Sequence, residues 1–135
     1  MNLQYTLLKT IKFKIMAKTN EPKNLKVLSI KFQENWNKKL YGKYFTTIRK
    51  HDYYLNKGDI VDIVLKGKAV ASAKVIECDV LFFHELGHVM VMCDTGYNYA
   101  DSLELFYKFG INVKSFETKV KVYLLENLYF YQKKE

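Results

Sequence analysis

The order of its predicted elements places this chain in the α+β class, with one sheet that curls into a small barrel. Three observations support this class. At 135 residues, 49% of them apolar, the chain has room for one domain and one core. Stretches with apolar residues at alternate positions, typical of strands, recur from Leu25 onward. Turn sequences separate them, and only two or three short segments have the spacing of helices.

The first half of the predicted domain contributes two strands and a short helix. Leu25–Phe32 has the apolar pattern of a strand. Glu34–Tyr41 has one apolar face and is predicted to be a short helix, with Gly42 placed for a left-handed cap at its end. Phe45–Arg49 is rich in residues that favour strands.

The second half is predicted to hold a hairpin, a helix and a closing strand. Gly58 and Gly67 mark two turns, and the second joins the strands of the hairpin. Asn98 is placed to cap the helix. In chain order the elements are the strands Ile60–Leu65 and Ala69–Cys78, the helix Ala100–Phe109 and the strand Lys119–Leu125. The predicted order is therefore β-α-β-β-β-α-β.

The chain is predicted to divide into a basic N-terminal extension (1–24), one folded domain (25–128) and a short C-terminal tail (129–135). No apolar run approaches the roughly 20 residues that span a bilayer, so no membrane span is expected. Lysines interrupt the N-terminal apolar stretch, which argues against a signal peptide. Two isolated cysteines, Cys78 and Cys93, lack metal or redox spacing. We expect a cytoplasmic protein without a cofactor.

Positive charge is concentrated in the first part of the chain. The net charge is +8 overall, and residues 1–57 alone carry +10 while the remainder carries −2. A basic face of this kind favours a nucleic-acid partner, although a solvated lysine surface is the simpler alternative. Arg49 is the only arginine among 22 basic residues. Because its planar fork binds in ways that lysine cannot imitate, it is a candidate for a specific contact.

The segment "FFHELGH" contains the zinc-protease pattern H-E-x-x-H. On a helix from about Leu81 to Met92, His84 and His88 would bind one metal, Glu85 would act as the base, and Glu104 would be the natural third ligand. Glycine and β-branched residues in this segment disfavour such a helix. We therefore treat metal binding as the alternative and expect two incidental histidines.

Three segments together resemble the ASCH family of PUA-like β-barrels. "LYGKYFTTIRK" resembles the family signature G-x-K-x-x-[ET]-x-R, and "LNKGDIVDIV" resembles its Gly-Asp turn into a strand. "VLFFHELG", "DTGYNYADSLELFYKFG" and "TKVKVYLLE" resemble its F-x-E-L turn, its last helix and its final strand. The resemblance covers roughly a hundred residues in the family's order. It implies a curled PUA-like barrel in which His84 and His88 have no metal role.

The resemblance also implies a ligand-binding cleft around the signature. Carried over to this chain, the binding residues are Gly42, Lys43, Tyr44, Thr47, Arg49 and Lys50. A related branch of amidohydrolases removes the acetyl group of N4-acetylcytidine with a lysine, a threonine and an acidic residue. Here the threonine corresponds to Thr47 and the acidic residue to Asp94, while Tyr44 stands where the lysine is expected.

We therefore expect a nucleic-acid-binding module that binds RNA or a modified nucleotide. The alternatives are an amidohydrolase acting on an acylated nucleoside and, behind it, a zinc peptidase. Because tyrosine, with its ordinary pKa near ~10, is a weak base at neutral pH, binding without turnover is the primary expectation.

Overall fold

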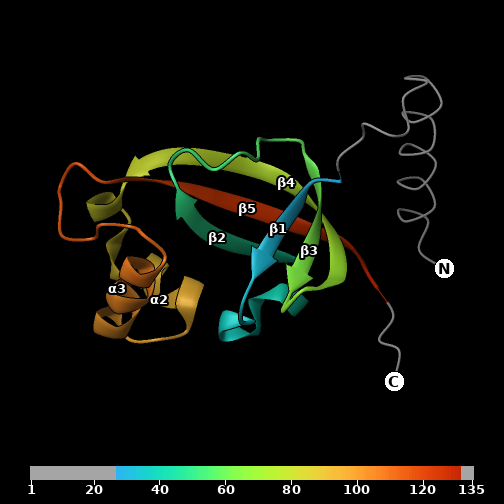
Figure 1. Ribbon diagram of the computed structural model, residues 1–135, viewed down its shortest axis with the longest axis horizontal. Coiled ribbons are helices and arrows are strands. Elements are labelled where there is room, and N and C mark those ends of the chain that lie inside the picture. Colours follow the sequence, from blue (N-terminus) through green and yellow to red (C-terminus); the bar gives the residue numbers. More distant parts are fainter. Residues whose placement is uncertain (1–26, 132–135) are drawn as a thin grey trace.

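The computed structural model describes residues 27–131 (Figure 1). The predicted extension, residues 1–24, and residues 132–135 of the predicted tail lie outside the described part. The strands are β1 (Ser29–Phe32), β2 (Tyr44–Lys50), β3 (Ile60–Leu65), β4 (Lys68–Phe82) and β5 (Lys119–Phe130). The helical segments are the 3₁₀ helices η1 (Trp36–Tyr41) and η2 (Phe83–Glu85) and the α-helices α2 (Gly87–Thr95) and α3 (Tyr99–Lys108).

The five strands form one curled sheet in the order β1-β3-β4-β5-β2. The pair β1–β3 is parallel and every other pair is antiparallel. Register shifts in β4 near Ser72 and Val75 mark bulges, which bend a strand and increase its twist. This bending brings the two edge strands, β1 and β2, toward each other. The gap that remains between them is the seam. The predicted α+β class with a small barrel-like sheet is confirmed.

Two apolar clusters lie on opposite faces of the sheet. Alternate residues of a strand point to opposite faces, so in β2 Phe45 joins one cluster and Ile48 the other. The first cluster fills the inside of the curled sheet, where Ile63 and Tyr123 are fully buried. The second lies beneath α2 and α3, which pack against each other at one end of the sheet (Figure 1). The site described below lies where these two regions meet.

The segment after β1 differs from its prediction as a helix with a glycine cap. It forms the 3₁₀ helix η1, in which Asn37 and Lys38 already take positive φ angles of 57° and 53°. The Asn37 side chain donates a hydrogen bond to the carbonyl of Cys93 in α2. Because the chain has turned before it reaches Gly42, that glycine is extended, with φ −75° and ψ 157°. The predicted left-handed cap is wrong.

Two further boundaries differ from expectation. The second hairpin strand was predicted to end at Cys78, but β4 continues to Phe82 because it pairs with β5 along that length. The expected F-x-E-L turn forms η2, but the residues after it, to which the ASCH resemblance gave no helix, form α2 over Gly87–Thr95. No helix among residues 27–131 is long and apolar enough to cross a membrane.

Candidate ligand-binding pocket

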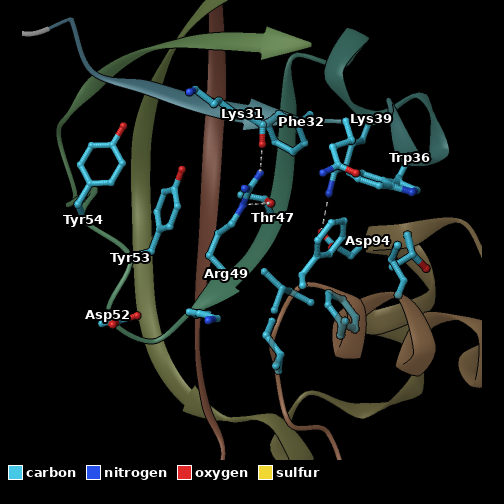
Figure 2. Close-up of a pocket in the computed structure, with 18 residues that line it drawn as sticks. Lys31, Phe32, Trp36, Lys39, Thr47, Arg49, Asp52, Tyr53, Tyr54 and Asp94 are labelled. Carbon is cyan, nitrogen blue, oxygen red and sulfur yellow. Dashed lines mark hydrogen bonds and ion pairs between the residues drawn. The ribbon is translucent and has the colours of Figure 1, made fainter. Parts of the chain in front are cut away.

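A pocket of about 490 Å³ opens at the seam between β1 and β2. Its walls come from η1, from the loop that follows β2, and from the facing sides of α2 and α3 (Figure 2). Its size lies within the range of small-molecule sites, about 300–1,000 Å³. Basic side chains outnumber acidic ones on the walls: Lys31, Lys39, Arg49 and Lys50 against Asp52 and Asp94. The pocket is therefore suited to a ligand with negative charge.

Arg49 connects the two edges of the sheet across the seam (Figure 2). Its Nε donates to Thr47 Oγ1 at 3.1 Å, and its Nη2 donates to the carbonyl oxygen of Lys31 in β1 at 3.0 Å. The guanidinium lies 4.6 Å from the ring centroid of Phe32 and 5.3 Å from that of Tyr53. Burial lowers the pKa of Arg49, which nevertheless stays charged at neutral pH.

The third guanidinium nitrogen of Arg49 has no partner among the residues that the structure describes. Within residues 27–131, Nη1 donates no hydrogen bond to a protein atom. Since Nε and Nη2 are already fixed, the group is held in one orientation before any ligand arrives. A rigid donor of this kind loses little conformational entropy on binding.

Aromatic side chains form much of the remaining wall. Tyr53 and Tyr54 come from the loop after β2, and Trp36 and Phe109 meet edge to face at 5.6 Å on the opposite side. The Tyr54 hydroxyl donates to the carbonyl of Ser29 and accepts from its backbone N–H, which ties the loop to β1. Flat apolar walls around a charged fork suit a planar, polar ligand such as a nucleobase.

The loop that carries these tyrosines is held from below by two side chains of β5. The Lys121 amine donates to the carbonyls of Tyr53 and Leu55, at 3.2 and 2.6 Å. The hydroxyl of Tyr123 donates to the Leu55 carbonyl at 2.8 Å. These bonds fix the position of the pocket wall, and burial raises the pKa of Tyr123 so that it stays protonated.

A buried ion pair lies on the helix side of the pocket. Lys39 of η1 and Asp94 of α2 meet at 2.9 Å, with side chains only 10% and 5% exposed. Thr46 donates a second hydrogen bond to the same carboxylate oxygen, Oδ1, at 3.1 Å. The pKa of Lys39 lies below its ordinary value of 10.5, because burial outweighs the attraction of Asp94. The other carboxylate oxygen accepts no hydrogen bond from the described residues.

The structure brings together some of the site residues expected from the sequence. Thr47, Arg49, Lys50 and Asp94 line the pocket. Gly42, Lys43 and Tyr44 do not line it. The Asn127 side chain donates to the Gly42 carbonyl at 2.6 Å, and the Lys43 amine lies over the exposed Tyr44 ring at 5.7 Å.

Tyr44 lies outside the pocket because it begins β2, where it pairs with Glu126 of β5, whereas the pocket is lined by the last four residues of the strand. Its side chain is 55% exposed, and a hydrogen bond with Glu126 raises its pKa. The signature position therefore supplies no base to this pocket. Tyr53 and Tyr54, which line the pocket, are two of the aromatic residues beside the signature that the sequence offers for base stacking, whereas Lys39 was not anticipated as a site residue. No local pattern marks Lys39, which stands beside another lysine in a basic stretch.

The histidines of "HELGH" do not share a continuous helix. His84 lies in η2 and His88 in α2, and between them Gly87 takes a φ of 72°. The His84 ring stacks on Phe82, while that of His88 stacks on Tyr99 with centroids 3.7 Å apart. In the part of the chain that the structure describes, no three His, Cys, Asp or Glu side chains gather as a metal site would require. The helix required by the zinc alternative is not formed, and Glu85 instead caps η2 through the Phe82 backbone N–H.

Comparison with known proteins supports the fold. No protein-family model and no curated protein matches this sequence. In structure, the chain is similar to the crystal structure of protein EF3133 from Enterococcus faecalis V583, described as a member of family DUF984. The TM-score is 0.56 at 10% sequence identity, over 90% of this chain and 95% of that chain. The similarity supports a small barrel-like fold, and ASCH membership stays a prediction from the sequence.

Proposed function

We propose that this protein binds RNA or a modified nucleotide, with one base held in the pocket at the seam between β1 and β2. The proposal rests chiefly on Arg49. A guanidinium fixed by Thr47 and the Lys31 carbonyl, with one nitrogen that bonds to none of residues 27–131, suits recognition of a base edge or a phosphate.

The surroundings of Arg49 agree with this class of ligand. Tyr53, Tyr54 and Trp36 supply faces and edges against which a planar base can pack. Lys31 and Lys50 lie at the exposed rim, where they can meet a phosphate without a large desolvation cost. Asp94 offers a carboxylate oxygen as acceptor for an exocyclic amino group.

The test is binding of fluorescent RNA oligonucleotides by anisotropy, at two salt concentrations. Arg49→Ala is expected to weaken binding by about 10- to 100-fold, the loss that goes with a specific base or phosphate contact. Lys66→Ala is the matched control: that lysine is exposed on the turn between β3 and β4 and pairs only loosely with Glu34, at 3.6 Å. A twofold effect or less is expected there. Equal losses would mean that binding is diffuse and that the pocket is not the site.

A second candidate is hydrolysis of an amide on an acylated nucleoside. One observation favours it: Lys39, Thr47 and Asp94 line the same pocket, and the lowered pKa of Lys39 increases the neutral fraction of its amine. A neutral amine can take the proton of a threonine hydroxyl as that oxygen attacks a carbonyl. Lys39 would then fill the role for which the signature position holds Tyr44.

Incubation with N4-acetylcytidine, followed by chromatography for cytidine, separates binding from catalysis. If the pocket only binds, neither the wild type nor Tyr44→Lys releases cytidine, since that side chain lies outside the pocket. Release by the wild type that both Thr47→Val and Lys39→Met abolish, while circular dichroism shows both variants folded at the assay temperature, would establish the hydrolase instead. Arg49→Ala serves in the same assay as a variant that loses affinity.

A further inference from the structure

We propose that the ligand is a single-stranded RNA of about four nucleotides or more, which runs from the pocket to an aromatic patch at the end of β4. This inference rests on the proposed function and specifies its partner. The aromatic patch consists of Phe82, His84, Phe116 and Lys119. A free nucleotide would leave it unused.

The patch is built from stacked rings with a cation beside them. Phe82 and His84 are nearly parallel, with an interplanar angle of 18° and centroids 5.5 Å apart. Phe116 meets His84 edge to face at 5.4 Å, and the Lys119 amine lies 5.3 Å from the Phe82 centroid. Phe116 is 78% exposed. An exposed ring costs stability in water, whereas an unpaired base stacks on such a ring readily.

A second hollow joins the pocket to this patch. It has a volume of about 470 Å³ and shares three lining residues with the pocket: Lys50, Asp52 and Ile111. Its far wall ends at Lys119, which belongs to the aromatic patch. The surface is therefore continuous from the pocket to the patch.

The strand register places both ends of this path on one face of the sheet. Arg49 pairs with Lys121, and Phe82 pairs with Lys119, two residues earlier in β5. Paired residues and every second residue share a face. With strands about 4.8 Å apart and about 3.3 Å per residue, the Cα atoms of Arg49 and Phe82 lie roughly 12 Å apart. At about 3.4 Å per stacked nucleotide, that distance corresponds to three or four nucleotides.

The charges along the path decide what holds the strand. Lys50 and Lys119 can each meet a phosphate, but Asp52 and Glu117 line the same hollow. The electrostatic gain there is consequently small. Stacking on Phe116 and His84 must supply most of the added affinity, and because every base has a flat face, this part of the site tolerates any sequence.

The test is a length series of RNA homopolymers of each base, with one, two, four and six nucleotides, measured by calorimetry. Affinity is expected to rise at least tenfold between two and six nucleotides. The double variant Phe116→Ala, Lys119→Ala should remove that gain without changing binding of the mononucleotide. Phe130→Ala, Lys68→Ala is the matched control, since Phe130 is 45% exposed at the other end of β5 and Lys68 begins β4 at the hairpin turn.

The outcomes separate this inference from the function on which it rests. Mononucleotide binding that needs Arg49 but does not strengthen with length would overturn the extended path and leave the pocket in place. A length gain that both double variants reduce equally would overturn it too, because it would come from charge and apolar surface anywhere. No binding of any oligonucleotide would overturn both proposals. Circular dichroism of each variant checks that the fold is retained.

Discussion

Replacing Lys39 by methionine is expected to destabilise the protein strongly, although lysine is usually a dispensable surface residue. The methionine keeps the apolar stem of the side chain and removes the charge. Asp94, with 5% of its side chain exposed, would then keep one hydrogen-bonding partner within the described part of the chain, Thr46. A buried charge stripped of its counter-ion costs about 3–5 kcal/mol.

A second substitution separates the cost of the unpaired Asp94 charge from any loss of packing. Asp94→Asn in the same chain removes the stranded charge while keeping an oxygen that can accept from Thr46. The double variant should recover about 2 kcal/mol or more relative to Lys39→Met alone, since residues in direct contact couple by roughly 0.5–3 kcal/mol. For a domain of this size the single substitution should lower Tm by roughly 10–20 °C.

Urea unfolding followed by circular dichroism measures the stability of the wild type, of Lys39→Met, of Asp94→Asn and of the double variant. The m-value should stay constant, which shows that the change lies in stability rather than in the compactness of either state. A loss below about 1 kcal/mol for Lys39→Met, with no recovery in the double variant, would refute the argument. It would mean that water reaches Asp94 and that the pair behaves as a surface salt bridge.

Three further predictions concern groups around the pocket. The pKa of Lys39 is lowered in the folded chain, so the folded chain releases this proton at a lower pH than the unfolded chain, whose Lys39 has the ordinary pKa of 10.5. The wild type should therefore gain stability relative to Lys39→Met as the pH rises toward 10.5. Urea titrations at several pH values measure this gain. Lys121→Met should cost about 2 kcal/mol and speed hydrogen exchange in the loop between β2 and β3, whose carbonyls the amine holds. Gly96→Ala should cost more than Gly67→Ala in urea midpoints. Both glycines have positive φ, but at Gly96 the new methyl group would also meet the backbone of η1, with Asn37 Cα at 3.2 Å, whereas at Gly67 it would meet nothing within 4 Å.

Much of the sheet was predictable because it depends on local alternation. In β3, Val61 and Ile63 are fully buried and alternate with half-buried neighbours, and β5 alternates in the same way from Tyr123 to Asn127. The turn at Gly67 also followed from its sequence, since the residue takes a φ of 82° that favours glycine. Patterns of period two identify strands wherever one face is buried.

The helix α2 shows where local reasoning fails. Its sequence, GHVMVMCDT, begins with glycine and has apolar residues all around, so no period identifies it. Contacts with η1, β2 and α3 stabilise it instead. The consequence for the site is direct: Asp94, given by the resemblance only as an acidic residue, lies in the last turn of this helix, where it meets Lys39.

Lys39 itself was beyond prediction for a related reason. Its partner is 55 residues away in the chain, and its inward position depends on the left-handed backbone of Asn37 and Lys38. Had the segment formed a regular α-helix, the side chain would have followed a different face. The sequence alone indicates a basic stretch, and only the three-dimensional structure shows which of its lysines is buried.

Arg49 was singled out because it is the only arginine in a chain rich in lysine, and the structure supplies a physical reason for that choice. The group must reach Thr47 and a β1 carbonyl at once, from a position between two aromatic rings. A lysine amine at the same place could not span both acceptors in one plane. The same contacts of Arg49 therefore both link β1 to β2 and shape the pocket. For this reason Arg49→Lys should reduce stability and ligand affinity together, whereas Lys50→Ala should reduce affinity alone.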